Sequence, residues 1–332
     1  MNAEILRSSS ELMQELARQM EINKGQSKEI ERLQLFFNEM EATNNHLIAA
    51  TWREREMKRQ LKETLDELSK TKQIVESQNM RISESISYAR KIQLAINATE
   101  TNLKEEFPES FIYYKPKDVI SGDFPWYYKT GNSVFFAAVD CTGHGVPGAM
   151  LSIIGNLLLN DIIANHPGKK TSEVLDSLHN QVVQTLKQNS PGNLSSDGMD
   201  IALCKVDLDE KKIYFSGAHR PLLFVKKDGT SVILKGDRFP IGGMQYKGQN
   251  QYSEQVLPYE EGDMVYIFSD GYPDQVGGVE NRKFSTNRLN ELLASPGSAD
   301  MDHVEMNIDR TFSHWKGVNR QVDDVLIIGV KF

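Results

Sequence analysis

The first third of the chain contains almost none of the residues that end helices. The first proline is Pro108, and Gly25 is the only glycine before Gly122. Because proline and glycine are the strongest local breakers of regular structure, this stretch predicts a mostly helical segment. Residues 1–98 carry 15 basic and 15 acidic side chains, so the whole net charge of -8 lies in the rest of the chain. We therefore expect a helical segment over 1–98 and a folded domain over 104–332.

Two apolar repeats run along the helical segment. The first consists of Ile30, Leu33, Phe37, Met40, Asn44 and Leu47, and the second of Leu61, Leu68, Val75, Ile82, Ala89 and Ile96. Alternating steps of three and four keep one seam facing a partner helix, and a seam asparagine such as Asn44 fixes register. The change of phase between the repeats implies a stutter. We expect a parallel dimeric coiled coil that serves dimerisation and signalling, with a solvated helix or an intramolecular hairpin as the alternatives.

From Phe107 onward, short β-rich runs alternate with Gly, Asp and Pro turns. The predicted strands are Ser133–Val139, Ile201–Val206, Ile213–Phe215, Leu222–Val225, Val232–Leu234, Met264–Phe268 and Val325–Phe332. Asp228-Gly229 is a typical hairpin turn, which favours antiparallel pairing. Ala149–Ile163 and Ser172–Leu186 read as helices, the first of them apolar almost all round and so buried. Strands with inserted helices predict an α+β layered domain.

Composition excludes several classes of protein. The hydrophobic fraction of 39% and the charged fraction of 25% are those of a soluble protein. We read no uninterrupted apolar run of about 18 residues and no basic-then-apolar start, so we expect a cytoplasmic chain with no membrane association. The net charge of -8 argues against nucleic-acid binding. Two cysteines, Cys141 and Cys204, provide neither a disulfide framework nor a metal knuckle.

Acidic residues are placed at the ends of the predicted strands. Asp140 and Asp270 close hydrophobic strands, whereas Asp323 and Asp324 precede the last one. If that last strand is antiparallel to the other two, its start lies at the same sheet edge as their ends. Asp123, after Gly122, is a fourth candidate from a separate segment. We therefore expect carboxylates from several segments on one rim.

Carboxylates gathered on one rim repel one another unless cations neutralise them. Oxygen ligands without a Cys or His cluster indicate Mg²⁺ or Mn²⁺ in preference to Zn²⁺. Two such ions about 3.5 to 4 Å apart lower the pKa of a bridging water and hold the oxygens of a phosphoryl group. A lone Asp beside Gly is more often a turn residue, so the interpretation depends on the whole set.

The residues from about 104 to 332 resemble the PPM-type metal-dependent serine/threonine phosphatases, in particular their bacterial SpoIIE/RsbU-like branch. The motifs that carry the resemblance, in order, are KPKDVISGDF at 115–124, DCTGHGVPGA at 140–149, GAHRP at 217–221, PIGG at 240–243, SDG at 269–271 and QVDD at 321–324. The resemblance implies two antiparallel sheets flanked by helices, with two metal ions at one end of the sandwich. It also implies hydrolysis of phosphoserine or phosphothreonine on a partner protein in bacterial signalling.

By position in the motifs, the resemblance implies specific ligands. Asp123, Asp140, Asp270 and Asp323 match the metal-binding aspartates. The backbone carbonyl of Cys141 matches a further ligand, which leaves its thiol incidental. Asp324 stands where relatives have Asp or Asn, and we expect it to support the residues that bind the metal without binding the metal itself. Asp274, together with Asp197 or Asp200, could hold a third and weaker ion, with loop solubility as the alternative role.

His144 invites a role as general acid because imidazole titrates near neutral pH. The wider family places its candidate histidine two residues after the metal-binding Asp, where this chain has Thr142. A loop-shaping role beside Gly143 and Gly145 therefore stays open for His144. Lys115, Lys117 and Arg220 could attract phosphate, against the ordinary reading as surface charges. Leu326 stands where many relatives carry Thr.

The expected partners also follow from the resemblance. In this branch the substrate is often an anti-sigma-factor antagonist with a STAS fold, and residues 82–93 resemble the helical linker that couples dimer geometry to activity. We expect an upstream sensor to act through the coiled coil. Two other functions stay open: a catalytically silent coiled-coil scaffold with a phosphatase-like binding domain, and a hydrolase of nucleotides or small phosphoesters. Gathering four aspartates argues against the scaffold.

Overall fold

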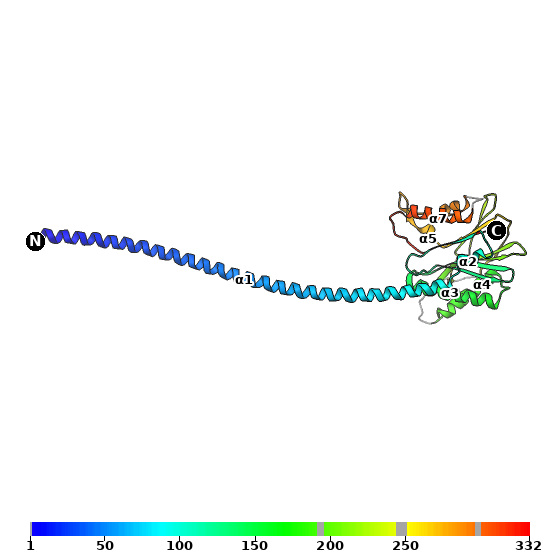
Figure 1. Cartoon of the computed structure of the whole chain (residues 1–332), viewed down its shortest axis with the longest axis horizontal. Helices are drawn as coiled ribbons and strands as arrows, with labels where there is room; N and C mark the ends of the chain where they lie inside the picture. Colours follow the sequence, from blue (N-terminus) through cyan, green and yellow to red (C-terminus); the bar gives the residue numbers. More distant parts are fainter. Residues whose placement is uncertain (1, 191–195, 244–250, 296–299) are drawn as a thin grey trace. The chain divides into compact units, whose positions relative to one another are not determined.

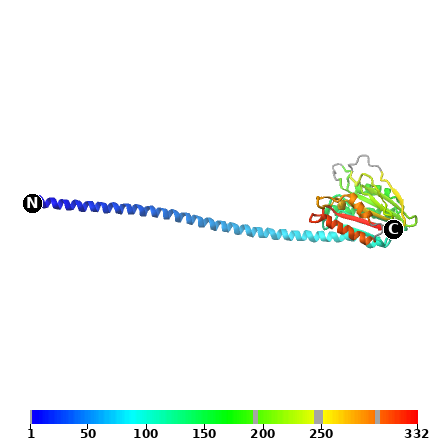
Figure 2. The same ribbon diagram turned by 90° about the horizontal axis from the view of Figure 1, so that it is seen from above.

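The computed structural model describes residues 2–190, 196–243, 251–295 and 300–332, with side chains from residue 9 onward. Its first element is one long helix, α1 (Asn2–Ile96), which both Figure 1 and Figure 2 show as unbroken. The prediction of a mostly helical first third is confirmed. Residues of the predicted seam are exposed from Ile30 to Ile82, as Leu33 (63%) and Leu68 (62%) illustrate, whereas Ala89 and Ile96 are half-buried. In this single chain, the apolar stripe of α1 is therefore not covered between Ile30 and Ile82.

The chain divides into two compact units, Met1–Met80 and Arg81–Phe332, so the last turns of α1 belong to the second unit. Gln93 is buried there. Its amide nitrogen donates to the Ser121 carbonyl oxygen at 2.7 Å and to the Ser152 hydroxyl at 2.8 Å, and its amide oxygen accepts from the Ser121 backbone nitrogen at 3.2 Å. One side chain thus ties the end of α1 to two other segments of the domain.

The second unit contains two antiparallel sheets. The five-stranded sheet has the order β1-β13-β10-β6-β7, with β1 Ser110–Lys115, β13 Val325–Lys331, β10 Met264–Phe268, β6 Leu222–Val225 and β7 Ser231–Leu234. The six-stranded sheet has the order β2-β3-β4-β5-β9, with β8 paired to β4; the strands are β2 Phe124–Thr130, β3 Ser133–Cys141, β4 Gly198–Asp207, β5 Lys212–Ala218, β9 Gln255–Pro258 and β8 Ile241–Gly242. The predicted hairpin at Asp228-Gly229 joins β6 and β7, and Gly229 has the positive φ of 87° that such a turn requires.

Helices cover the outer face of each sheet, so the domain has four layers, and Figure 1 shows α7 on one side with α3 and α4 on the other. The helices are α2 Glu100–Lys104, α3 Gly145–Asn165, α4 Thr171–Thr185, α5 Gly271–Asp274, α6 Thr286–Ala294 and α7 Met301–Lys316, and a short hairpin pairs β11 Val276–Gly277 with β12 Arg282–Lys283. This α+β sandwich of antiparallel sheets flanked by helices confirms the predicted fold class.

Alternation along β3 shows why these residues form the middle of a sandwich. Phe135 and Ala137 pack toward α3 and α4, whereas Val134 and Phe136 pack between the two sheets. Successive side chains of a strand point to opposite faces, so a strand buried on both faces reads as one continuous apolar run. The same division holds in β13, where Ile327 faces α7 and Ile328 faces the other sheet.

Helix α3 is long and apolar enough, by length and composition, to cross a membrane. Its mean hydropathy over the relevant window is 1.5, and half of that window is buried inside the domain. Leu159 and Ile163 of α3 are buried in the cluster beneath the six-stranded sheet. The helix is therefore a core helix of the folded domain, as the burial predicted from its sequence requires.

Candidate active site

Asp140 is the next-to-last residue of β3 and not the residue after it, as the sequence had suggested. The strand continues through Cys141 because both residues keep register with β4, where Asp140 lies opposite Asp200 and Cys141 opposite Met199. The Cys141 thiol is buried in the apolar cluster against α3 and α4, and this burial raises its pKa. The thiol is thus part of the core, in keeping with the expectation that only the carbonyl of this residue serves the site.

Asp270 and Asp323 come from the other sheet. Phe268 at the end of β10 lies opposite Ile327 near the start of β13, so the antiparallel pairing brings the end of one strand to the start of the other, as predicted. The expectation that all these strands share one sheet is wrong, because β3 lies in the six-stranded sheet. The carboxylates therefore meet at one end of the sandwich, where the edges of two sheets come together.

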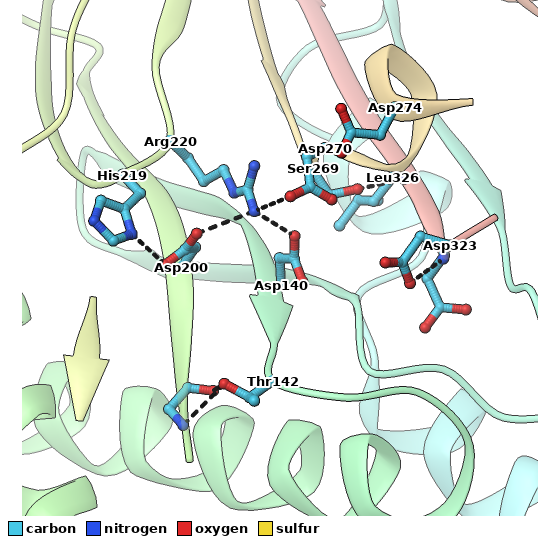
Figure 3. A network of polar contacts seen from close by, with 12 residues as sticks. Asp140, Thr142, Asp200, His219, Arg220, Ser269, Asp270, Asp274, Asp323 and Leu326 are labelled. Carbon is cyan, nitrogen blue, oxygen red and sulfur yellow. Dashed lines mark hydrogen bonds and ion pairs between the residues drawn. The ribbon is translucent and has the colours of Figure 1, made fainter. Parts of the chain in front are cut away.

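Arg220 lies between the two sheets and binds carboxylates from both (Figure 3). Its Nη2 atom is 2.7 Å from Asp140 Oδ2, 2.8 Å from Asp270 Oδ2 and 3.0 Å from Asp200 Oδ2. The Nδ1 atom of His219 is 2.9 Å from the other oxygen of Asp200. Only 15% of the Arg220 side chain is exposed, so the ordinary reading of Arg220 as a surface charge is wrong.

Asp123 is held just before β2 and is only 3% exposed. Its backbone nitrogen donates to the Ser121 hydroxyl at 3.0 Å, and the Tyr114 hydroxyl donates to its carbonyl oxygen at 2.9 Å. Its Oδ2 atom is buried and has no hydrogen-bond partner among the described residues. Burial and the charge of Asp140 raise the pKa of Asp123. A buried carboxylate oxygen without a donor is the kind of group that a cation satisfies.

Asp140 shows the same shortage of positive charge. Burial raises its pKa to about 7, and the charges of Asp270 and Asp200 add to this while Arg220 opposes it. Burial likewise raises the pKa of Asp323, whose Oδ1 atom accepts from the Asp324 backbone nitrogen at 2.9 Å. The single positive charge of Arg220 therefore does not balance the negative charges of the carboxylates that surround it.

Asp324 holds the loop that carries Asp123. It is 2% exposed, and its two oxygens accept from the backbone nitrogens of Lys117 at 2.7 Å and Gly122 at 2.8 Å. A Cβ atom at position 122 would lie 2.5 Å from the Gly143 carbonyl oxygen and 3.1 Å from that of Cys141, so only glycine allows this approach. Asp324 and Gly122 thus fix the distance between the Asp123 loop and the end of β3.

Other residues singled out from the sequence are not gathered in the same way. Asp274 is the last residue of α5, the short helix that follows Asp270, and Figure 3 shows it near Asp270. Its Oδ2 atom nevertheless pairs with Lys283 Nζ, at 2.7 Å. Asp197 is exposed, and its carbonyl oxygen accepts from Gln188 at 2.6 Å. Lys115 pairs with Asp309 of α7.

His144 precedes α3, and its side chain is 53% exposed. Its Nδ1 atom lies 2.8 Å from Asp118 Oδ2. Thr142, at the position where relatives carry a histidine, binds the Gly198 carbonyl oxygen through its hydroxyl at 3.0 Å. The contact of His144 therefore joins two loops, and that of Thr142 joins the end of β3 to the first residue of β4. Neither contact involves Asp140 or Asp270.

Sequence reasoning missed Ser269, which joins the segment that carries Asp270 to the start of β13 in the five-stranded sheet. Its hydroxyl accepts from the Leu326 backbone nitrogen at 3.0 Å, and its own nitrogen donates to the Leu326 carbonyl oxygen at 3.0 Å (Figure 3). The Leu326 side chain is buried between the sheets, which explains why an apolar residue is tolerated there. Ser269 lies in the SDG motif, so its position beside Asp270 was the available signal.

The donors fit hard divalent ions. All the side-chain donors are carboxylates, one of them has an orphaned buried oxygen, and the thiol of Cys141 is turned into the core. Within the described ranges no three His, Cys, Asp or Glu residues are already arranged to hold a metal ion. The guanidinium of Arg220 lies among three of the carboxylates instead.

Known structures share this fold. The PP2C domain of SiaA from Pseudomonas aeruginosa superposes with a TM-score of 0.69 at 27% sequence identity, over 76% of this chain and 98% of that one. The PP2C phosphatase domain of SpoIIE from Bacillus subtilis superposes with a TM-score of 0.54 at 15% identity, over 68% of this chain and 63% of that one, which concerns the fold alone. The second unit is therefore a PP2C-type phosphatase domain.

The sequence comparisons place the chain more closely. Residues 130–332 match the family described as Stage II sporulation protein E (SpoIIE). The chain belongs to the SpoIIE family, which confirms the resemblance seen in the motifs. Phosphoserine phosphatase RsbU of Bacillus subtilis (strain 168) is 24% identical over 188 residues, which cover 54% of this chain and 52% of that protein. The chain thus spans about half the length of the curated relative it matches.

Proposed function

We propose that this protein is a metal-dependent phosphatase that hydrolyses phosphoserine or phosphothreonine on a partner protein. The single observation that carries the proposal is that carboxylates from both sheets, Asp140 and Asp270, converge on one guanidinium, while Asp123 beside Asp140 has a buried oxygen with no hydrogen-bond partner among the described residues. Gathering buried carboxylates is costly without cations, so the arrangement is explained by ion binding and not by stability. The resemblance of the fold to phosphatase domains agrees with this assignment.

Asp123, Asp140, Asp270, Asp323 and the carbonyl oxygen of Cys141 would hold two ions, Mn²⁺ or Mg²⁺. When bound, such ions supply a water of lowered pKa and neutralise the charge of the phosphoryl group. Asp274 with Asp197 or Asp200 is the proposed place of a third, weaker ion, for which Asp274 must leave Lys283.

The chain's own residues position these groups. Asp324 supports the site by fixing the Asp123 loop through the backbone nitrogens of Lys117 and Gly122. Ser269 keeps the end of β10 against the start of β13, and so sets the separation of Asp270 from Asp323. For His144 we infer the loop-shaping role in preference to proton transfer, because its ring is half exposed and binds Asp118.

We propose that residues 1–98 form the signalling and dimerisation segment and residues 104–332 the phosphatase domain. The exposed seam of α1, with Leu33 at 63% and Leu68 at 62%, supports a parallel coiled coil with a second copy of the chain. An upstream regulator would act through this coiled coil. Gln93 offers the physical connection, because it joins the end of α1 to the segment that carries Asp123.

The proposed substrate is a phosphoprotein of a sigma-factor regulatory pathway, such as an anti-sigma-factor antagonist with a STAS fold, in the cytoplasm. Support comes from RsbU, the phosphoserine phosphatase to which the chain is similar, and from a solved structure that joins RsbU and RsbW domains, that of Rv1364c from Mycobacterium tuberculosis. That structure has a TM-score of 0.53 at 19% identity.

The experiment is phosphate release by the full chain from a phosphoserine peptide, with Mn²⁺, with Mg²⁺ and with a chelator. Turnover that requires the ion and is not suppressed by an excess of nucleotide or aryl phosphate supports the proposal. Preference for the small phosphoesters would replace it with a small-molecule hydrolase. Metal binding without turnover on any substrate would favour the scaffold.

A further inference from the structure

Arg220 contacts the carboxylates in an arrangement that is unusual for arginine. A guanidinium normally binds a carboxylate through two parallel N–H donors. Here one atom, Nη2, makes all three contacts, at 2.7 Å, 2.8 Å and 3.0 Å, with Asp140, Asp270 and Asp200. Nη2 carries two hydrogens and donates them to Asp140 Oδ2 and Asp270 Oδ2. Its contact with Asp200 Oδ2 is an ion pair without a hydrogen bond of its own, so one atom meets three anions.

A second nitrogen of the side chain, Nε, takes no part in these contacts. The Nε atom of Arg220 is buried and has no hydrogen-bond partner in the part of the chain that the structure describes. A buried donor without a partner costs free energy, which the two hydrogen bonds from Nη2 and the attraction of the three carboxylates must offset. The charges of Asp140, Asp270 and Asp200 raise the pKa of Arg220 although burial lowers it. Charge neutralisation and the two charge-assisted hydrogen bonds therefore hold the guanidinium among the carboxylates.

The carboxylates to which Nη2 donates belong to two of the proposed metal ligands. The oxygen Oδ2 of Asp140 and the oxygen Oδ2 of Asp270 both face Nη2, from opposite sheets. A divalent ion of this class binds carboxylate oxygens at about 2.0 to 2.2 Å, closer than any of these contacts. Nη2 and an ion that binds both oxygens cannot occupy the same place, so one excludes the other.

The backbone of Arg220 is held by close contacts, so only its side chain can move away from the carboxylates. Its nitrogen donates to the Ala218 carbonyl oxygen at 2.7 Å. Its own carbonyl oxygen would lie 2.3 Å from a Cβ atom at Gly217 and 2.7 Å from one at Gly236, so both glycines pack directly against it. The guanidinium can therefore withdraw from the carboxylates by rotation about side-chain bonds while its backbone stays in position.

We propose that Arg220 is a tethered counter-cation that competes with the divalent ion for Asp140 and Asp270, and so sets the metal affinity of the site. The proposal rests on the proposed function in that these two carboxylates hold the ion. In the metal-free protein the guanidinium keeps the carboxylates together. Loading the metal displaces it, and the affinity is lowered by the interaction that the guanidinium gives up.

The test measures Mn²⁺ binding to the full chain by isothermal titration calorimetry, without substrate, for the wild type, Arg220→Gln, Arg220→Lys and Arg238→Gln. Arg238 is exposed and near in sequence, so its variant controls for the loss of one positive charge. We expect the dissociation constant to fall about 10-fold in Arg220→Gln, because an opposing charge in contact with the ligands is removed. Arg220→Lys should bind a few-fold tighter than the wild type, since its ammonium reaches less far, and Arg238→Gln should equal the wild type.

An unchanged or weaker affinity in both Arg220 variants, while Arg238→Gln binds as the wild type does, would overturn the proposal. A gain of affinity cannot come from a merely damaged fold. If Arg220→Gln does not fold without metal, the Mn²⁺ affinity of Arg220→Lys decides whether the proposal holds. The difference in thermal unfolding temperature between Mn²⁺ and chelator is a second measure of metal affinity for both variants. Asp270→Asn in the same assay tests the metal site itself: if that variant binds Mn²⁺ like the wild type, the proposed function fails independently of Arg220.

Discussion

At the level of single residues, Gly122 lies where the Asp123 loop passes closest to the end of β3. We predict that Gly122→Ala lowers the free energy of unfolding by about 1 to 3 kcal/mol, because the new methyl group meets the Gly143 carbonyl oxygen at 2.5 Å. Metal-dependent turnover should fall with it, since Asp123 must move. Gly168→Ala is the matched control, because a Cβ atom there has nothing within 4 Å. Urea unfolding checks both, and equal stability of the two variants would contradict the account.

His179 is predicted to make stability depend on pH. Its Nδ1 atom accepts from the Gly242 backbone nitrogen at 3.0 Å, and burial lowers its pKa below 6.5, against the charge of Asp176. The folded chain therefore binds fewer protons at this site than the unfolded chain. The resulting stability is present above pH 6.5 and is lost as pH falls toward the native pKa.

The measurement is urea unfolding at pH 7 and at pH 5.5. His179→Asn keeps an acceptor for Gly242 but does not titrate, so its loss of stability between the two pH values should be smaller than that of the wild type. His166→Asn, at an exposed position, should leave the loss unchanged. An identical pH dependence in the wild type and His179→Asn would show that the burial of this ring has no such effect.

The sequence identified individual aspartates of the site better than it identified their surroundings. Asp140 and Asp270 could be predicted because each stands at the end of an apolar run. The contact of Arg220 with both could not, because it depends on how two separate sheets face each other, and spacing along the chain carries no such information. The pairing of Asp140 with Asp200 follows from the register of β3 and β4, which is likewise a property of the fold.

Among the elements, the end of α1 is the one whose contacts reach toward the site. We predict that Gln93→Ala lowers the free energy of unfolding by about 1 to 3 kcal/mol, because Ser121 loses two hydrogen bonds in a buried place. Metal-dependent phosphate release should fall more than stability alone explains, since Ser121 also binds the Asp123 backbone nitrogen.

Gln73→Ala, at an exposed position of the same helix, is the control for any change in helix propensity. Both variants are assayed as full chains for thermal unfolding and for phosphate release. Full activity in a destabilised Gln93→Ala would mean that this residue serves the fold only. Loss of activity at unchanged stability would be the clearest sign of coupling.

The strands were predictable to the extent that their residues repeat a simple pattern. The limits of Leu222–Val225 and Met264–Phe268 agree with β6 and β10, because both are short apolar runs bounded by polar residues. Strand β2 was missed since it contains Pro125, which usually argues against a strand. Proline is tolerated there because β2 is an edge strand of its sheet.

For the whole molecule, the coiled-coil proposal predicts the oligomeric state. Replacing Leu61 and Leu68 together by Gln should convert the full chain from dimer to monomer, because both belong to the exposed seam. Replacing Glu63 and Lys70 by Gln, also on α1 but off the seam, should leave the dimer intact. Light scattering coupled to size-exclusion chromatography measures the mass, and a wild type that is monomeric at all concentrations would refute the dimer.

Phosphate release from a phosphoserine peptide at increasing Mn²⁺ shows whether carboxylates from both sheets form one metal-dependent hydrolytic site. The comparison is between the full-length wild type, Asp140→Asn from β3, Asp270→Asn from beyond β10, and Asp161→Asn on an exposed turn of α3 as the control. We expect turnover that requires Mn²⁺, that falls by about 100-fold or more in the two site variants and that is retained in the control. Wild-type rates in either folded site variant would show that its carboxylate is not part of a metal-dependent site.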